Sequence, residues 1–482
     1  MLGIVDLFSE RTLCKLICCL IFLTFPTVAV HCTNLKPLVK ISIERPSEVT
    51  IEAEMPQPGR EWSFRNAYAG ALNLGDRIDK FEVLGPAQEI LPVRRITAGE
   101  YRTDQLVQRF RYTVNASSRG AAEVAHVTWL SDDYGCLLLA DLLPTLFDGV
   151  EMSVELKLPS QWSAQFVGST DANGRAVISK PEDAVFLVGP NLRKQSQSIN
   201  GQRINLALVG EWRVSDGTIM ESAQKVFAHY LGLTQYKLSD DPLLIVVPYR
   251  FSGGNSWRAQ TRGANVVLAM DPGAGFRNWK GQLSVIFTHE FFHLWVPNSL
   301  GLKGDYDWFF EGFTLYEALL TALQLKLIKF QEYLDTLARV YDSYLSYPDD
   351  LSLIEASERR WTSSFPLVYD KGMLVALQYD LIVRTESDGR ANLSDLYHRL
   401  FNQPQTQAND ANTAIIGLLD SSVSDKEFSS RYVEKKGTLD LTSSLRQYGI
   451  VVDSSGKRTT ITIDRNLNNK QLRVLRSLGY RQ

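Results

Sequence analysis

Cysteine is scarce in this sequence, and its spacing excludes a disulfide framework. The 482 residues contain five cysteines, of which Cys14, Cys18 and Cys19 lie in an apolar N-terminal segment. The remaining two, Cys32 and Cys136, lack the spacing of a metal knuckle. We expect Cys136 to be a buried, small hydrophobic side chain. A bridge to Cys32 is the alternative if Cys32 is retained in the mature chain.

An excess of charge of either sign is also absent. The chain has 51 Lys and Arg against 54 Asp and Glu, which gives a formal net charge of −3. Such a chain has no global field that attracts nucleic acid or an anionic membrane, so we expect no nucleic-acid partner. Repeats and long polar tracts are missing, and 44% hydrophobic with 22% charged residues is an ordinary globular composition. The length predicts two or three domains.

No apolar stretch is long enough to predict a membrane span. The longest, residues 16–30, follows two basic residues and is interrupted by proline, a pattern typical of a cleaved export signal. We expect residues 1–32 to be that signal and the protein to be periplasmic or secreted. A membrane anchor is the alternative, and membrane contact is expected only if this segment is uncleaved or lipidated. Lipidation of Cys32 is disfavoured because His31 occupies a position that prefers a small residue.

The hydrophobic pattern changes along the chain. Residues 35–200 alternate apolar and polar side chains in short runs separated by turn residues, which predicts an antiparallel, sandwich-like β-domain over residues 33–205. A helical period then dominates, so we expect a mostly helical domain over residues 206–450 and a short extension over residues 451–482. The predicted fold class is α+β.

Within the second domain, individual elements can be placed. Two apolar runs are expected to be buried strands, at residues 242–249 and 265–270. The helical patterns cover residues 283–295, 310–327, 330–344 and 371–384.

The clearest chemical motif is His289-Glu290-Phe-Phe-His293, inside a helical pattern. Histidines four residues apart lie on one face of a helix and can reach the same ion. Neutral imidazoles suit zinc, and a site with one open position acidifies water, whose proton the adjacent Glu290 can take. The alternative is that both histidines merely pack or face solvent. With only six histidines in the chain, this pattern is rare by chance.

A third zinc ligand is expected on a second helix. Glu311 stands 18 positions after His293 within an apolar run, where a carboxylate without a cation would be costly to bury. The alternative is a charge that stabilises the start of a helix. Glu317 is a poorer candidate because it lies on a different helical face.

These segments resemble the glycyl aminopeptidase family of gluzincin metallopeptidases. The resemblance rests on residues 289–295 (HEFFHLW) and 308–316 (WFFEGFTLY), followed in order by 352–357 (SLIEAS) and 369–372 (YDKG). It implies a β-rich N-terminal domain, a thermolysin-like catalytic domain, one Zn²⁺ per chain and hydrolysis of peptide or protein substrates. About 30 residues follow Val451, so we do not expect the C-terminal PDZ domain of many family members.

The resemblance also implies a role for Tyr369. In the related membrane alanyl aminopeptidases, a tyrosine before an acidic-Lys-Gly step donates a hydrogen bond to the oxyanion of the tetrahedral intermediate. Without the resemblance, Tyr369 could equally be a boundary aromatic with its hydroxyl in water. Glu290 and Tyr369 are therefore the predicted catalytic residues.

One part of the family pattern is missing. Aminopeptidases of this clan hold the substrate's amino group with an anion, usually a glutamate in a Gly-rich strand, but residues 250–270 contain no acidic residue. They contain Arg250, Arg258 and Arg262. These arginines are either solvated loop charges, or one of them binds a carboxylate of the substrate. The backbone expected to line the cleft is that of Gly253, Gly254 and Asn255.

The sequence therefore predicts a zinc-dependent peptidase, without settling whether it is an aminopeptidase. The alternative is a catalytically weak or inactive protein of the peptidase fold that binds peptides or a protein partner. Hydrolysis of a non-peptide amide or ester is also open, because zinc-assisted chemistry acts on those bonds too.

Overall fold

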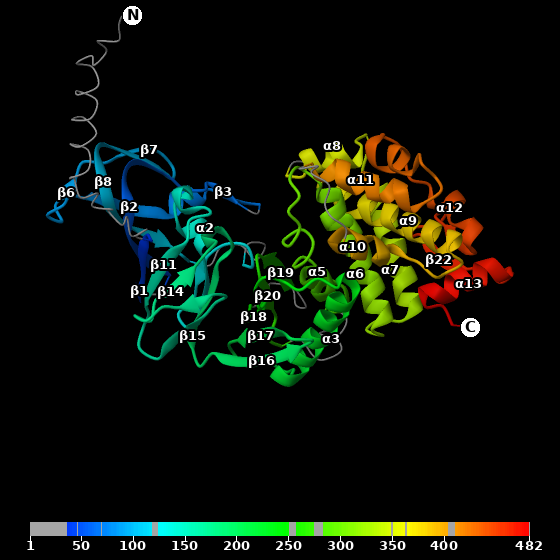
Figure 1. The fold of residues 1–482 in the computed structure, drawn as a ribbon, viewed down its shortest axis with the longest axis horizontal. Helices are drawn as coiled ribbons and strands as arrows, with labels where there is room; N and C mark the ends of the chain where they lie inside the picture. The colour runs from blue at the N-terminus through cyan, green and yellow to red at the C-terminus, as the bar shows by residue number, and fades with distance from the viewer. Residues whose placement is uncertain are drawn as a thin grey trace, which may run out of the picture. The chain divides into compact units, whose positions relative to one another are not determined.

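Strands fill the first part of the chain and helices fill the last in this computed structural model (Figure 1). The structure describes residues 36–45, 47–68, 70–117, 124–249, 257–273, 283–348, 350–361, 364–402 and 410–481. The predicted export signal lies outside them. Residues Pro37–Gln482 form one compact unit.

A nine-stranded sheet begins the described chain. Its order is β13-β14-β11-β1-β2-β8-β5-β6, with β7 paired to β8, and only the β1–β11 pair is parallel. The strands alternate buried and exposed residues, as the sequence pattern predicts for a sheet with one buried face. Their bounds are β1 Leu38–Arg45, β2 Glu48–Ser63, β5 Ile78–Leu84, β6 Ile90–Leu91, β7 Arg94–Thr97, β8 Glu100–Asn115, β11 Met152–Lys157, β13 Ser169–Thr170 and β14 Ala176–Ile178.

A four-stranded antiparallel sheet, ordered β12-β15-β10-β9, is buried on both faces at its centre. Leu137 and Phe186 join the core of the nine-stranded sheet, whereas their neighbours Cys136 and Leu187 join a second core. The free thiol of Cys136 is buried, as expected. The bounds are β9 Trp129–Leu130, β10 Gly135–Leu138, β12 Trp162–Gln165 and β15 Val185–Pro190.

The second core is shared with a five-stranded mixed sheet, ordered β16-β17-β18-β20-β19. Strands β17, β18 and β20 run parallel, and β16 and β19 are antiparallel edge strands. The two strands predicted from apolar runs are β18 and β20. The bounds are β16 Arg193–Ile199, β17 Gln202–Leu208, β18 Leu243–Pro248, β19 Trp257–Arg262 and β20 Asn265–Met270. The expected domain boundary after residue 205 falls within β17, and the boundaries stay a prediction.

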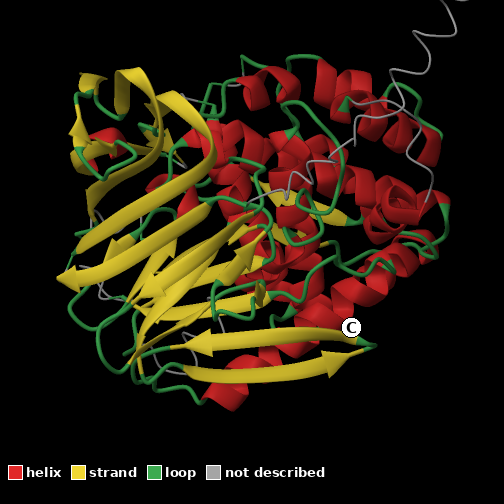
Figure 2. Cartoon of the chain, turned by 60° about the vertical axis from the view of Figure 1, so that its left-hand side comes forward, coloured by secondary structure: helices red, strands yellow, loops and turns green. Residues whose placement is uncertain are grey.

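Helices make up most of the chain beyond β20, and Figure 2 draws the helices of the molecule in red beside its strands in yellow. The α-helices are α2 Leu139–Leu142, α3 Asp216–Thr234, α5 Thr288–Phe292, α6 Thr314–Gln324, α7 Phe330–Leu345, α8 Leu353–Glu358, α9 Gly372–Glu386, α10 Leu393–Asn402, α11 Ala411–Ser422, α12 Leu441–Ser444 and α13 Asn469–Leu478. Short 3₁₀ turns are η1 Leu74–Arg77, η2 Thr145–Phe147, η3 Pro181–Asp183 and η8 Arg446–Tyr448. Two small hairpins are β3 Ala67–Tyr68 with β4 Ala71–Leu72, and β21 Ile450–Asp453 with β22 Thr460–Ile463.

The predicted helices are present, but three of them begin with a π-helical turn. The π turns are η4 Leu283–Phe287 before α5, η5 Trp308–Phe313 before α6 and η6 Leu367–Lys371 before α9, and a fourth is η7 Ser430–Glu434. Such turns are frequent at functional sites. The helix expected to reach residue 295 ends near His293, four residues before Pro297, which cannot continue it.

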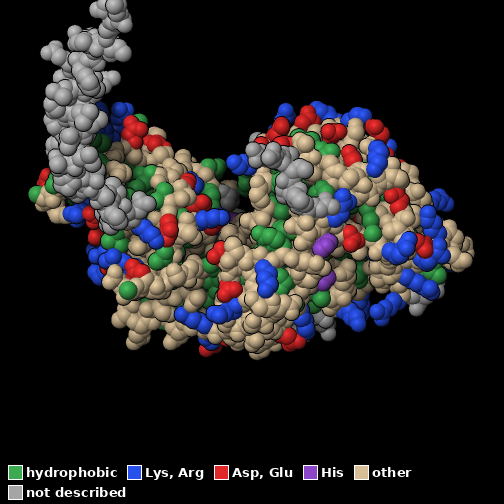
Figure 3. Space-filling view, in the orientation of Figure 1, with side chains coloured by type: hydrophobic (Ala, Val, Ile, Leu, Met, Phe, Trp, Pro, Cys, Tyr) green, Lys and Arg blue, Asp and Glu red, His purple; other side chains and the backbone are tan. Residues whose placement is uncertain are grey.

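The surface carries charges of both signs. On the face drawn in Figure 3, Lys and Arg are interspersed with Asp and Glu, in keeping with the balanced composition. Among the helices of the described residues, none is long and apolar enough to cross a membrane.

Candidate metal centre

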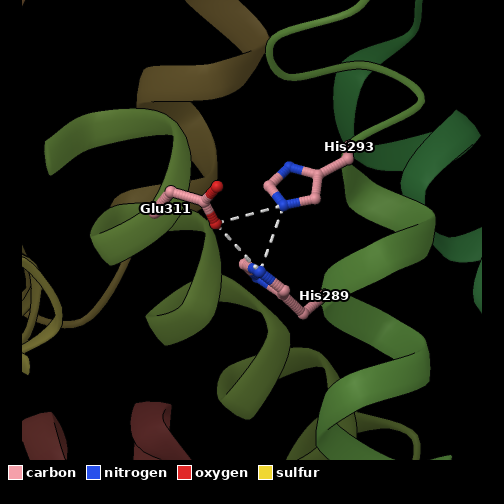
Figure 4. Close-up of side chains that lie close together, drawn as sticks. All are labelled: His289, His293 and Glu311. Atoms are coloured by element: carbon pink, nitrogen blue, oxygen red, sulfur yellow. Dashed lines mark hydrogen bonds and ion pairs between the residues drawn. The ribbon is translucent and has the colours of Figure 1, made fainter. Parts of the chain in front are cut away.

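The structure brings the three predicted ligands together. His289 and His293 project from one face of α5, and Glu311 projects toward them from η5 (Figure 4). The two Nε2 atoms are 3.1 Å apart, and Glu311 Oε2 lies 3.3 Å from His289 Nε2 and 3.4 Å from His293 Nε2. All three side chains are buried.

This triangle has the dimensions of a tetrahedral zinc site. Zinc ligands at about 2.0–2.2 Å from the ion in tetrahedral geometry lie about 3.4 Å from one another. Two imidazoles and one carboxylate are the donor set of catalytic zinc, and they leave the fourth position open. The residues present therefore fit the ion that the sequence predicts.

Contacts of the Nδ1 atoms, on the side of each ring away from Glu311, orient both imidazoles. His293 Nδ1 lies 2.8 Å from the carbonyl oxygen of Val296, which requires a proton on Nδ1 and makes Nε2 the nitrogen that can bind a metal. His289 Nδ1 lies 3.4 Å from the hydroxyl of Thr314, which itself donates to the Phe310 carbonyl at 2.6 Å. Both rings thus turn Nε2 toward Glu311.

The electrostatics of the centre favour a cation. Burial acts to lower the pKa of His293, but the negative charge of Glu311 and its hydrogen bond outweigh burial and raise that pKa to about 9. Burial alone would raise the pKa of Glu311, yet His293, the hydrogen bond from His289 and the charge of Arg360 hold it well below its usual range. A positive charge between these side chains, as a proton or a metal ion, is therefore stabilised.

Glu290, the predicted base, is held from a neighbouring strand. The hydroxyl of Thr261 on β19 lies 2.9 Å from Glu290 Oε2 and 2.5 Å from the Glu290 carbonyl oxygen. The charge of Glu290 contributes to raising the pKa of both His293 and Tyr369, so its carboxylate belongs to the same centre. Sequence analysis missed Thr261, which stands 29 positions before Glu290 on a different element.

Tyr369 also reaches this centre, from η6. Arg360 Nη2 donates to its hydroxyl oxygen at 2.8 Å. Burial and the negative charge of Glu311 raise the pKa of Tyr369 well above its ordinary value. The phenol therefore keeps its proton at neutral pH and remains a hydrogen-bond donor.

Arg360 joins the metal ligand to the tyrosine, and sequence analysis missed it. Its Nη2 donates to Glu311 Oε1 at 2.7 Å, and its Nη1 donates to Asp307 at 2.5 Å. The guanidinium also lies 4.7 Å from the centre of the Trp361 ring. No spacing rule could have found it, because Arg360 is 49 positions from Glu311.

Two glycines allow this close assembly of helices. A Cβ atom at Gly312 would lie 2.5 Å from the Cα atom of Gly372, and one at Gly372 would lie 3.0 Å from the Cα atom of Gly312. Because neither has a side chain, η5 and the start of α9 touch through their backbones. This contact brings η6, with Tyr369, next to Glu311.

A cavity of about 760 Å³ opens beside the ligands. Its lining includes Thr261, Arg262, His293, Glu311 and Arg360. The further lining residues are Ala67, Tyr68, Gly70, Ala71, Leu72, Asp183, Gln260, Gly263, Pro297, Asn298, Phe310 and Trp361. Such a cavity has the size expected for a small substrate or a short stretch of peptide.

Four residues that the sequence singled out cannot be placed relative to the centre, and Glu317 is not a ligand. Gly253, Gly254 and Asn255, expected to line the cleft, lie outside the described residues, as does Arg250. Glu317 points away from the ligands and accepts a hydrogen bond from Ser394 at 3.1 Å, in line with the prediction that it occupies a different helical face.

The fold is similar to that of solved M1 zinc metallopeptidases. An aminopeptidase N family protein from Idiomarina loihiensis matches with a TM-score of 0.73 at 18% identity, over 86% of this chain and 79% of that chain. An M1 zinc metallopeptidase from Deinococcus radiodurans matches with a TM-score of 0.51 at 14% identity, over 84% of this chain and 95% of that chain. A variant of a two-domain M1 zinc metallopeptidase bound to L-arginine matches with a TM-score of 0.52 at 14% identity, over 85% of this chain and 95% of that chain.

At 14–18% sequence identity, the similarity to these solved structures shows the fold alone. The predicted α+β class, with a β-rich N-terminal part before a mostly helical part, is confirmed. Neither a protein-family model nor a curated protein matches the chain.

Proposed function

We propose that this protein is a zinc-dependent peptidase that binds one Zn²⁺ per chain through His289, His293 and Glu311. The observation that carries the proposal is the triangle of 3.1–3.4 Å between their ligand atoms, which matches a tetrahedral zinc site open at one position. The M1-like fold supports it, because the solved proteins of similar fold are described as zinc metallopeptidases.

The chain supplies the proton-transfer groups for hydrolysis. When bound, zinc supplies Lewis acidity that polarises a substrate carbonyl and acidifies water. Glu290 takes the proton of the attacking water and later gives it to the leaving amine, while Thr261 fixes the position of its carboxylate. Tyr369, which keeps its proton, donates a hydrogen bond to the oxygen on which negative charge develops.

Arg360 positions the metal ligand Glu311 and the hydrogen-bond donor Tyr369 without contacting the reacting atoms. By donating to Glu311 Oε1 it leaves Oε2 for the ion, and by donating to the Tyr369 oxygen it fixes the phenol beside the ligands. A cation next to that oxygen also makes the phenol a stronger donor.

The substrate is proposed to be a peptide or protein, and the site of action to lie outside the cytoplasm, as the N-terminal pattern indicates. Membership of the glycyl aminopeptidase family stays a prediction, and residues 250–270 contain no acidic residue that could hold a free amino group of the substrate.

Product mapping on a peptide mixture tests the proposal. Mass spectrometry of the products, with and without a chelator, shows turnover, metal dependence and the position of cleavage together. We expect cleavage that stops on chelation and returns with zinc. No cleavage of any peptide by zinc-loaded protein would instead favour the alternative of a peptidase-fold protein that only binds peptides or a protein partner.

A further inference from the structure

Arg262 is a buried cation that faces the metal cavity without an anionic partner. It ends β19, is 8% exposed and lines the cavity. Its guanidinium makes no hydrogen bond or ion pair with any residue that the structure describes, and its Nε is fully buried and unpaired. The contact that it does make is with the face of the Tyr68 ring, 4.4 Å from the ring centre.

This arrangement leaves hydrogen-bonding capacity unused. A cation over an aromatic ring is attracted by the negative face of the ring, but the ring occupies none of the five guanidinium N–H donors. Burial and the nearby charge of Arg65 lower the pKa of Arg262 to about 10, so it is still a cation at neutral pH. A buried charge without a partner is costly, which points to a partner that arrives with the substrate.

Neighbouring charges do not provide that partner. Arg65 is itself a cation, and it pairs with Asp148, to which its Nη2 donates at 2.5 Å. Asp183 lines the same cavity and packs against Gly263, where a Cβ atom would lie 2.7 Å from the Asp183 Cβ atom. No ion pair joins Asp183 to Arg262 in the described part of the chain.

The position of Arg262 ties it to the reaction centre. It follows Thr261, whose hydroxyl contacts the Glu290 carboxylate at 2.9 Å. Adjacent strand residues point to opposite faces, so Thr261 faces α5 whereas Arg262 faces Tyr68, and the cavity contacts both. A group held by Arg262 therefore lies in the cavity that the metal ligands His293 and Glu311 also line.

We propose that Arg262 binds a carboxylate of the substrate, which selects peptides that carry a carboxylate close to the cleaved bond. This inference rests on the proposed peptidase function and names its substrate class. A carboxylate accepts two parallel hydrogen bonds from a guanidinium, and in a buried site it removes the cost of the unpaired charge. The source is either the C-terminal carboxylate of a short peptide or the side chain of Asp or Glu.

Matched peptides distinguish these sources. One pair differs by a free or amidated C-terminus, and a second set replaces Glu by Gln at each position flanking the cleaved bond. Since a hydrogen bond to a charged group contributes about 1.5–3 kcal/mol, neutralising the recognised carboxylate should lower kcat/KM of the wild-type protein about 10- to 100-fold. A third pair, with a free or acetylated N-terminus, tests whether Asp183 holds an amino group instead.

Substitution assigns the preference to Arg262. Arg262→Met should lose most of the discrimination between charged and neutral peptides, and Arg262→Lys should keep part of it. Arg258→Met is the matched control, because Arg258 lies on the same strand but is not among the cavity-lining residues, and it should discriminate like the wild type. Thermal unfolding checks that each variant is folded.

The outcomes separate this inference from the proposed function. Equal cleavage of charged and neutral peptides, unchanged discrimination in Arg262→Met, or dependence on the free amino group alone would each overturn the inference while leaving a peptidase. If zinc-loaded protein cleaves nothing, the proposed function fails, and calorimetric binding of the same peptides to zinc-loaded Glu290→Gln still tests Arg262. If that binding depends on the peptide carboxylate and is lost when Arg262→Met is added to Glu290→Gln, the result supports the role of Arg262.

Discussion

Arg360, which is partly exposed, and the buried Glu311 form an ion pair in which Nη2 donates to Oε1 at 2.7 Å. The other oxygen of Glu311, Oε2, faces the Nε2 atoms of His289 and His293. One carboxylate thus binds a fixed cation on one side and offers a ligand atom on the other. Partners that orient metal ligands in this way commonly change metal affinity or activity when they are removed.

Removing Arg360 should weaken zinc binding. We expect Arg360→Met to lower zinc affinity or activity about 10- to 100-fold, because Glu311 then rotates freely and Tyr369 loses its fixed partner. Competition with a chromogenic chelator measures the affinity. The control is Arg359→Met, an exposed neighbour, and a zinc affinity of Arg360→Met equal to that of this control would contradict the positioning role.

Thr261→Val should slow the reaction without releasing the metal. The substitution preserves shape but removes the hydroxyl 2.9 Å from Glu290 Oε2. Because a hydrogen bond to a charged group contributes about 1.5–3 kcal/mol, kcat should fall about 10- to 100-fold. Thr261→Ser should restore the rate. A Val variant as fast as wild type would show that Thr261 does not position the base.

Tyr369→Phe tests the oxyanion contact. Loss of one donor to a developing oxyanion typically lowers kcat by about 10²- to 10³-fold, and we expect KM and zinc content to change little. Steady-state kinetics with metal analysis separates these quantities. A change confined to KM would assign Tyr369 to ground-state binding rather than to catalysis.

Stability should fall as pH rises because of Glu317. Burial and the nearby charge of Asp380 raise the pKa of Glu317 from 4.5 to about 8. Between these values the folded protein retains a proton that the unfolded chain releases, so unfolding free energy decreases with pH, by at most about 1.4 kcal/mol per unit. Glu317→Gln should remove this component of the slope. Denaturant unfolding at several pH values measures it, and an unchanged slope would contradict the prediction.

The metal ligands could be predicted because the sequence around each of them carries a local signal. His289 and His293 share a face through the 3.6-residue period, and Glu311 is a carboxylate in an apolar run, which indicates a buried cation. The strands of the β-rich part follow from their period of two. These signals are local, so one sequence is enough to read them.

Thr261 and Arg360 could not be predicted because their contacts depend on the tertiary path of the chain. Thr261 reaches Glu290 from an edge strand, and Arg360 reaches Glu311 after three intervening helices, α6, α7 and α8. The π-helical turns were missed for a related reason, since an extra residue in one turn barely alters a hydrophobic pattern. For Arg262, the sequence left open both a solvated charge and carboxylate recognition, and the burial of its side chain excludes the solvated charge.

The most direct test of the central claim combines metal analysis with peptide cleavage by Glu290→Gln. This substitution removes the proposed base while keeping the three ligands His289, His293 and Glu311. The account predicts one zinc per chain in both proteins, cleavage by the wild type, and none by the variant. Wild-type activity in zinc-loaded Glu290→Gln, or a wild-type protein that binds no zinc, would contradict it.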